Sequence, residues 1–231
     1  RDSSTSRGLG DVYKRQYLDQ WNLKREDVIR PFDRPFGTDG SIAILKGNLA
    51  PDGAVVKHTV VPKEMFEAVL RARPFDCEED AIHAVLTHEI QPGDAVIIRY
   101  EGPKGSGMPE MFYTTEAIAS DATLGASIAL LTDGRFSGAS KGPAIGHISP
   151  EAAQGGPIAL VEENDLIEIS ISNRVLRIVG VNGERKSEEE MEAILKERKS
   201  RWQPRENKYT KGVLKQFAEK AVSPMKGGYM E

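Results

Sequence analysis

Two glycine-rich segments carry the side chains best suited to chemistry. The glutamate loop, residues 101–110, ends in Gly107-Met-Pro-Glu110, and the serine loop, residues 132–143, contains Ser137 next to Gly138. Each loop follows an apolar run that predicts a buried strand. Binding and catalytic side chains are often carried by loops that leave a rigid scaffold. We therefore expect both loops to lie at a functional site.

Glu110 is a candidate ligand for a hard metal ion. The glycines before it allow the backbone to approach a ligand closely, and Pro109 stiffens the chain beside the carboxylate. Mg²⁺ prefers oxygen ligands, and a carboxylate on a rigid loop suits it. One carboxylate is not a metal site, however, and taken alone Glu110 is better interpreted as a solvated loop residue.

Ser137 does not belong to a common nucleophile pattern. A hydrolase nucleophile elbow has glycine two residues before and after the serine, where this chain has Arg135 and Ala139. The glycine spacing of a phosphate-binding P-loop is also absent from the serine loop. A serine at a strand exit can contact a substrate, but from its residue type alone a helix-capping turn serine is favoured.

His147 and Cys77 are the other residues that invite a chemical interpretation. His147 follows the serine loop closely in sequence and is a candidate for lining the same site. His83 and His88 miss the i, i+4 spacing of a helical metal site. Cys77 is the one cysteine of the chain, so it can form neither an internal disulfide nor an iron–sulfur site alone. Its place in the first turn of a predicted helix favours a lowered thiol pKa, but a packing role is the better interpretation.

Composition excludes several classes of function. The 231 residues are 39% hydrophobic and 29% charged, which is typical of a folded globular protein. A net charge of -4, with scattered Lys and Arg, gives no basic surface for nucleic acid. No apolar run approaches the roughly 20 residues of a membrane span, and no signal-peptide pattern is present. We predict a cytoplasmic enzyme without a nucleic-acid or membrane partner.

Short apolar runs between Gly, Pro, Asn and Asp residues predict a strand-rich fold. The predicted strands are 41–45, 54–58, 95–100, 128–131, 157–161, 166–170 and 174–179. The predicted helices are 63–71, two that begin at capping boxes (76–79 and 187–190), and 211–222. Irregular strand spacing disfavours a doubly wound sheet. We predict a mixed α/β, β-barrel-like domain of the swivelling type, with flanking helices and a helical C-terminal tail.

The composition of the chain changes along its length. Residues 1–16 are polar, lack apolar periodicity and begin with arginine, so we interpret them as non-native or disordered. Residues 17–36 contain two Arg-Pro pairs and are interpreted as a linker from a missing N-terminal domain. Residues 37–183 would form the barrel-like body, and residues 184–231 the helical tail.

Several long motifs in one order resemble the C-terminal domain of the dihydroxy-acid dehydratase family, which also contains phosphogluconate and other sugar-acid dehydratases. The resemblance extends from about Phe32 to the end of the chain. Its motifs are Leu45-Lys-Gly-Asn-Leu-Ala-Pro-Asp-Gly53, Tyr100-Glu-Gly-Pro-Lys-Gly105, Gly107-Met-Pro-Glu110, Thr132-Asp-Gly-Arg-Phe-Ser-Gly138, Gly146-His-Ile-Ser-Pro-Glu-Ala-Ala153, Gly156-Pro-Ile-Ala-Leu-Val161 and Lys208-Tyr-Thr-Lys-Gly-Val-Leu214.

The resemblance implies dehydration of a small 2,3-dihydroxy acid to a 2-keto acid, with Mg²⁺ and an iron–sulfur cluster. It implies that Ser137 is the catalytic base and Glu110 a magnesium ligand. Arg135, Ser140 and His147, which lie in or close after the serine loop, are candidates for substrate binding. The family's cluster cysteines and other metal ligands lie in an N-terminal domain. This chain is therefore expected to be inactive alone and to act within a full-length, homo-oligomeric parent.

Two alternatives to a branched-chain dihydroxy-acid dehydratase remain open. The first is an aldonate dehydratase of the same family. Sugar-acid members often have a hydroxyl residue two positions after the serine, where this chain has Ala139, which favours the branched-chain substrate. The second is a non-catalytic module that binds a carboxylate or a partner chain.

Overall fold

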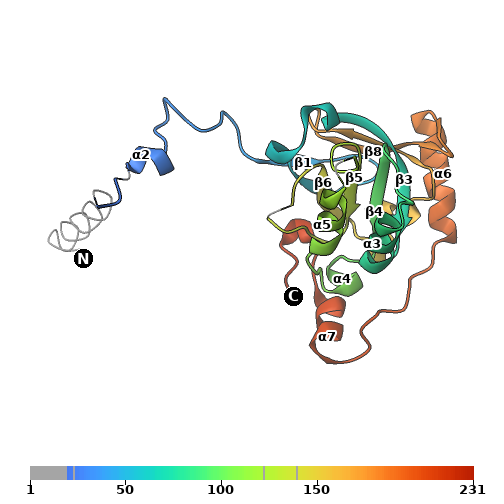
Figure 1. Cartoon of the computed structure of the whole chain (residues 1–231). Helices are drawn as coiled ribbons and strands as arrows, with labels where there is room; N and C mark the ends of the chain where they lie inside the picture. The colour runs from blue at the N-terminus through green and yellow to red at the C-terminus, as the bar shows by residue number, and fades with distance from the viewer. Residues whose placement is uncertain (1–19, 23, 122, 139) are drawn as a thin grey trace. The chain divides into compact units, whose positions relative to one another are not determined.

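The computed structural model describes residues 20–22, 24–121, 123–138 and 140–231 (Figure 1). By its internal contacts the chain divides into residues 1–40 and residues 41–231. The first unit contains helix α2 (Arg25–Val28) and an ion pair between Arg34 and Glu26 at 2.9 Å. The second unit contains the sheet, the other helices of the described residues and both loops that the sequence singles out.

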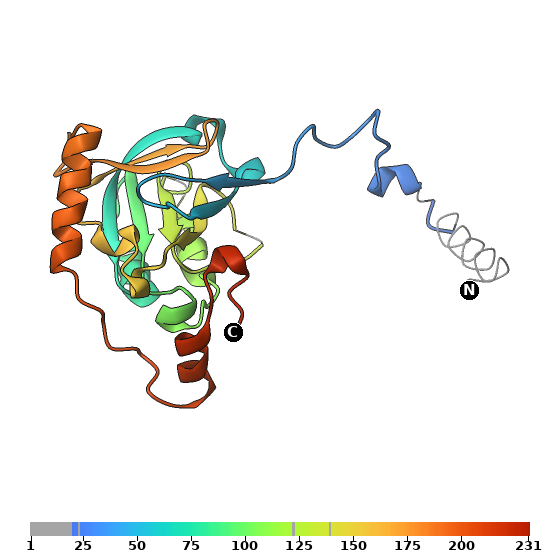
Figure 2. The same ribbon diagram turned by 180° about the vertical axis from the view of Figure 1, so that it is seen from behind.

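The described residues form a nine-stranded sheet with the order β1-β2-β6-β5-β4-β3-β7-β8-β9 (Figures 1 and 2). The strands are β1 (Ile42–Leu45), β2 (Gly53–Lys57), β3 (Glu67–Phe75), β4 (Asp94–Ile98), β5 (Ala129–Thr132), β6 (Ala144–Ser149), β7 (Leu166–Ser170), β8 (Val175–Val181) and β9 (Glu184–Arg185). Strands β3 to β6 pair in parallel, and all other neighbouring pairs are antiparallel.

The sheet curls so that its first and penultimate strands approach each other. Lys46, directly after β1, forms an isolated bridge with Val175 at the start of β8. The Lys46 amide donates to the Arg174 carbonyl at 2.9 Å, and the Leu176 amide donates to the Lys46 carbonyl at 2.9 Å. The expectation of a mixed α/β fold is confirmed, and the sheet has the form of a half-barrel.

Alternating side chains of the central strands fill two apolar clusters. Ala95 and Ile97 of β4 face the larger cluster inside the curled sheet, whereas Val96 and Ile98 face the smaller one. The period of two follows from strand geometry, in which successive side chains point to opposite faces. The smaller cluster is covered by α3 (Glu78–Leu86) and α5 (Phe112–Ser120), which contact each other.

The other described helices are α4 (Pro103–Ser106), α6 (Glu188–Arg201) and α7 (Gly212–Lys220). Five 3₁₀ turns also occur among the described residues, namely η1 (His58–Val60), η2 (Lys63–Met65), η3 (Ala152–Gln154), η4 (Pro157–Leu160) and η5 (Pro224–Lys226). The capping box predicted for α6 is present: the Glu190 amide donates to Ser187 Oγ, and the Ser187 amide donates to the Glu190 carboxylate.

Three sequence predictions of local structure are wrong. Residues 157–161 form the turn η4 rather than a strand, because Gly156 and Pro157 start a 3₁₀ turn. The helix predicted at 63–71 is instead η2 followed by β3, in which buried Leu70 and Ala72 alternate with exposed neighbours. The capping box predicted at Asp76 is absent, because the N-cap of α3 is Cys77 and makes no side-chain cap bond.

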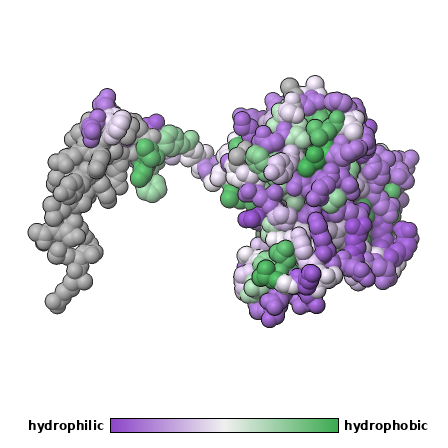
Figure 3. All heavy atoms as spheres, turned by 60° about the horizontal axis from the view of Figure 1, so that its bottom comes forward, coloured by the Kyte–Doolittle hydropathy of each residue, from purple (hydrophilic) through white to green (hydrophobic). Residues whose placement is uncertain are grey.

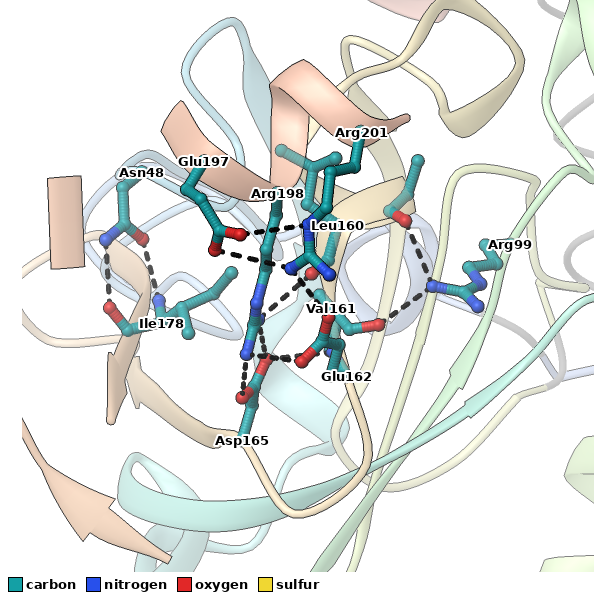
Figure 4. A network of polar contacts seen from close by, with 11 residues as sticks. Asn48, Arg99, Leu160, Val161, Glu162, Asp165, Ile178, Glu197, Arg198 and Arg201 are labelled. Atoms are coloured by element: carbon teal, nitrogen blue, oxygen red, sulfur yellow. Dashed lines mark hydrogen bonds and ion pairs between the residues drawn. The ribbon is translucent and has the colours of Figure 1, made fainter. Parts of the chain in front are cut away.

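Helix α6 is attached to the body by a buried ion pair (Figure 4). The Arg198 guanidinium donates to both Asp165 carboxylate oxygens, at 2.5 and 3.0 Å, and to the Leu160 carbonyl at 3.0 Å. The Asp165 side chain is fully buried and also accepts a hydrogen bond from the Glu162 amide at 2.9 Å. Both charges are thus removed from water and depend on each other.

Replacing Arg198 by Met should destabilise the protein by about 3–5 kcal/mol, because it leaves the Asp165 carboxylate buried without its cation. Arg201→Met, at an exposed position on the same helix, is the matched control and should cost less than about 1 kcal/mol. Urea denaturation of the two variants at neutral pH measures the difference. Equal stability losses would contradict the role assigned to the Arg198–Asp165 pair.

Candidate active site

The glutamate loop leaves the C-terminal end of β4 and contains the single-turn helix α4. Gly107 ends this helix in the left-handed region, with φ of 81°, which is where glycine is favoured. The chain then reaches Glu110, whose side chain is exposed. The structure therefore places the predicted metal ligand on a loop surface where an ion could reach it.

The serine loop leaves the C-terminal end of β5, the strand next to β4. The Ser140 amide donates to the Ser137 carbonyl at 3.1 Å, which closes a turn at Ser137. The Lys57 ammonium at the end of β2 donates to the Gly138 carbonyl at 3.1 Å. These contacts hold the half-buried Ser137 close after the C-terminal end of β5. Ala139 lies outside the described residues.

Backbone pairing joins the two loops. Glu110 and Arg135 form an isolated parallel bridge, in which the Met111 amide donates to the Arg135 carbonyl at 2.9 Å. A second hydrogen bond joins the same loops, in which Arg135 Nε donates to the Met108 carbonyl at 3.0 Å. Glu110 therefore lies beside Arg135, two residues before Ser137, as the adjacency of two parallel strands requires.

His147 lies next to the same loop. Its backbone amide donates to the Gly134 carbonyl at 2.8 Å, and its φ of 57° is unusual for a residue other than glycine. Burial lowers the pKa of the imidazole, and the positive charge of Arg135 lowers it further. A neutral imidazole at this position can donate or accept a hydrogen bond. The structure thus brings His147 and Arg135, two of the predicted substrate-binding residues, close together.

Ser140, the third predicted substrate-binding residue, has a buried hydroxyl oxygen that lacks a hydrogen-bond partner among the described residues. A buried polar atom without a partner is costly, and such atoms recur where a ligand completes the hydrogen bonding. This property fits a substrate contact.

The Asp133 carboxylate ties three segments together. It is fully buried and accepts hydrogen bonds from the amides of Tyr100 (3.1 Å), Glu101 (3.0 Å) and Ala152 (2.8 Å). The pKa of Asp133 is raised to about 7, chiefly by burial and also by the negative charge of nearby Glu151, while the three amide donors oppose the shift. One side chain thus fixes the start of the glutamate loop, the start of the serine loop and the chain after His147.

Glu151 and Glu101 support the glutamate loop from within. The Glu151 carboxylate accepts hydrogen bonds from the amides of Lys104 and Gly105 at 3.0 Å, and a Cβ on Gly102 would clash with this carboxylate. Glu101 is buried and accepts a hydrogen bond from the Ser106 hydroxyl. Burial raises the pKa of both carboxyls. Sequence reasoning missed these roles, although all three acids lie within the motifs that it singled out.

Cys77 differs from its expectation. It is the N-cap of α3, but burial raises the pKa of its thiol, and the carboxylates of Asp80 and Glu79 raise it further. The lowered pKa expected from a helix N-terminus is therefore wrong. A thiol with a raised pKa is a poor nucleophile and a poor metal ligand at neutral pH, which favours the packing role.

The donors of this chain fit a partial metal site only. Among the described residues, no group of three or more His, Cys, Asp or Glu side chains is arranged to hold a metal ion. Glu110, with an exposed carboxylate on a loop fixed by the bridge to Arg135, fits as one oxygen ligand of Mg²⁺. A single cysteine does not fit an iron–sulfur cluster.

No helix within the described ranges has the length and apolar character of a membrane span.

Comparison with known sequences identifies the family. The family described as "Dihydroxy-acid/6-phosphogluconate dehydratase C-terminal" matches residues 27–228. The chain therefore belongs to the dihydroxy-acid/6-phosphogluconate dehydratase family and corresponds to its C-terminal domain. This finding confirms the resemblance carried by the glutamate and serine loops.

Proteins named dihydroxy-acid dehydratase are similar to this chain over most of its length. The protein of Agathobacter rectalis is 53% identical over 205 residues, which are 88% of this chain and 35% of that protein. That of Clostridium kluyveri is 52% identical over 209 residues, 90% of this chain and 36% of that protein. That of Pyrococcus abyssi is 50% identical over 208 residues, 89% of this chain and 35% of that protein. The chain thus spans about a third of the length of these curated relatives.

The three buried carboxyls should make stability fall as pH rises. Because their folded-state pKa values are raised, the folded protein holds protons that the unfolded chain releases above about pH 4. The Asp133 contribution is complete below that pH and is lost as pH rises through about 7. Asp133→Asn, which cannot ionise, should show a smaller fall in the free energy of unfolding between pH 4 and 7. Urea titrations of both proteins measure it, and identical pH slopes would contradict the assignment.

Proposed function

We propose that this chain is the C-terminal part of a dihydroxy-acid dehydratase, which converts 2,3-dihydroxy-3-methyl acids to 2-keto acids in branched-chain amino-acid synthesis. The observation that carries the proposal is the bridge between Glu110 and Arg135, which joins the glutamate loop to the serine loop. The names of the relatives, at about 50% identity, support the reaction and the substrate class.

In the proposed reaction Ser137 is the catalytic base. Its deprotonated Oγ takes the hydrogen on C2 of the substrate as a proton, and the electron pair of that bond forms the C2–C3 double bond. The C3–O bond breaks, and the departing hydroxide takes up a proton and leaves as water. The resulting enol loses the proton of its C2 hydroxyl as the C2=O bond forms and gains a proton at C3, which gives the 2-keto acid, so the overall change is the loss of one water molecule.

A serine hydroxyl is a weak base at neutral pH unless positive charge lowers its pKa. The Lys57 ammonium is held at the carbonyl of Gly138, the residue after Ser137, and Arg135 lies two residues before it. Both cations belong to the surroundings of the serine and favour its deprotonated form. They are also suited to hold the carboxylate of an acid substrate.

His147 and Ser140 are proposed to contact the substrate. The imidazole, kept neutral by burial and by Arg135, can accept a hydrogen bond from a substrate hydroxyl. The buried Ser140 hydroxyl would gain in the bound substrate the partner that the described residues do not give it.

Metal chemistry is assigned only as far as this chain allows. Glu110 would be one ligand of Mg²⁺, and the bound ion would supply positive charge for the substrate and the deprotonated serine. The other ligands, and any iron–sulfur cluster, would belong to segments of the parent outside this chain. Because the chain has one cysteine, it is expected to be inactive alone.

The parts of the chain are assigned accordingly. Residues 17–36 would link an N-terminal domain to a body of the swivelling type at 37–183, followed by a helical tail at 184–231. The parent is proposed to be a cytoplasmic homo-oligomer that acts on a small dihydroxy acid.

Replacing Ser137 by Ala in the full-length enzyme should lower kcat by on the order of a thousandfold, because it removes the base. Ser120→Ala, at an exposed serine near the end of α5, is the matched control and should retain activity. Turnover of 2,3-dihydroxyisovalerate measures both. Wild-type activity in Ser137→Ala with an intact fold would refute the assignment. Activity on an aldonate alone would place the enzyme with the sugar-acid dehydratases.

Replacing Glu110 by Gln in the full-length enzyme should raise the Mg²⁺ concentration for half-maximal activity by about tenfold or more, because a neutral amide is a weaker ligand for a hard cation. Glu116→Gln, at an exposed position on α5, provides the control. Direct Mg²⁺ titration by calorimetry gives a readout that does not depend on turnover. An unchanged affinity for Mg²⁺ would show that Glu110 is not a ligand.

A further inference from the structure

The C-terminal segment of the chain lies against the glutamate loop. Residues 202–220, which we call the C-terminal clasp, run from the end of α6 as irregular chain and then form α7, close to α4 (Figures 1 and 2). Viewed with the bottom of Figure 1 brought forward, the surface is mostly hydrophilic, with separated apolar patches (Figure 3). Within α7, Ala218 is buried and Phe217 is partly buried, so the clasp contacts the body through apolar side chains as well as through polar groups.

Polar contacts connect the clasp to α4. The Asn207 side-chain amide donates to the Lys104 carbonyl at 2.9 Å, and the Lys104 ammonium donates to the Glu219 carbonyl at 3.1 Å. The Lys104 amide also donates a hydrogen bond to the Glu151 carboxylate, so Lys104 is bonded both to the clasp and to this buried acid. The single turn of α4 has few internal hydrogen bonds and depends on such outside partners.

Arg205 connects the clasp to Tyr100, the second residue after β4. Its guanidinium carbon lies 4.4 Å from the centre of the Tyr100 ring, and the guanidinium pairs with Asp76. The Trp202 indole nitrogen also lies 3.4 Å from the Tyr100 hydroxyl. Tyr100 is the residue whose amide donates to Asp133, so the clasp acts on the segment that Asp133 fixes.

An apolar contact reaches the end of α4 that is nearest to Glu110. A Cβ placed on Gly107 would lie 3.4 Å from Leu214 Cδ2 and 4.0 Å from Phe217 Cδ1, both on α7. The next residue, Met108, is the one whose carbonyl accepts from Arg135. A cavity of about 720 Å³ separates the clasp from other parts of the loop and is lined by Cys77, Glu101 and Lys208 among others.

We propose that the C-terminal clasp is a positioning element for the magnesium ligand Glu110, and that Asn207 and Leu214 are its principal positioning residues. This inference rests on the proposed function, because it gives the clasp a role in metal binding. Neither residue touches the reacting atoms in this assignment. They act by restricting α4, so that Glu110 stays beside Arg135 instead of sampling other loop conformations.

Hydrogen exchange tests the mechanical part of the proposal on this chain. In the double variant Asn207→Ala/Leu214→Ala, the amides of Ser106 and Met108, which donate to the Gly102 carbonyl, should exchange faster by on the order of tenfold. The amides of β4 and β5 should keep their protection. The control Lys215→Ala/Gln216→Ala changes two exposed residues of α7 and should leave exchange in α4 unchanged. Unchanged protection of Ser106 and Met108 in the double variant would overturn the proposal.

Mg²⁺ titration of the full-length enzyme tests the functional part. The double variant should need about tenfold more Mg²⁺ for half-maximal activity and should recover most of its kcat at saturating Mg²⁺. Faster exchange with an unchanged Mg²⁺ requirement would overturn the link between the clasp and Glu110. If the double variant does not fold, Asn207→Ala alone carries both measurements, because it removes one exposed contact. Failure of the proposed function would appear separately, as full activity in Ser137→Ala and Glu110→Gln.

Discussion

The buried Asp133 carboxylate is the interaction on which the candidate active site depends. It accepts hydrogen bonds from the adjacent amides of Tyr100 and Glu101 and from the amide of Ala152, so it joins the serine loop to two segments far away in the sequence. Parallel pairing of β4 and β5 brings the strand ends together, and Asp133 then fixes the loops that leave them. Without this acceptor, three buried amides would lose their partner at a cost of about 1–3 kcal/mol each. The buried Asp133 carboxylate therefore fixes the conformations of both loops where they leave the sheet.

The arrangement above Asp133 follows from this constraint. Fixed loop starts allow the bridge between Glu110 and Arg135, and Glu151 and the C-terminal clasp hold α4 between them. The buried acids serve structure, whereas Glu110, Ser137 and His147 remain accessible or partly accessible. The buried carboxyls of the site therefore fix the loops, whereas the exposed carboxyl of Glu110 is available to a substrate or a metal. Under the proposed function, the remaining metal ligands would come from another part of the parent.

The sequence predicts much of this structure, and its failures have physical causes. Apolar runs located β4 and β5 correctly, since both strands are buried on two faces. The run at 157–161 is equally apolar but begins with Pro157 in a 3₁₀ turn, which composition does not distinguish from a strand. The loops were singled out by their motifs, whereas the role of Asp133 could not be predicted, because a buried structural acid and an exposed acid have the same residue type. The three amides that donate to Asp133 are recognised only when the folded chain brings them together.

The central claim is that Glu110 and Ser137 belong to one active site. The most direct test is a crystal structure of the full-length enzyme with Mg²⁺ and 2,3-dihydroxyisovalerate bound. We predict that a Glu110 carboxylate oxygen lies about 2.1 Å from Mg²⁺. We also predict that Ser137 Oγ lies within about 3.5 Å of C2 of the substrate. A substrate bound elsewhere, or a magnesium ion held without Glu110 while Ser137 points away from C2, would contradict it.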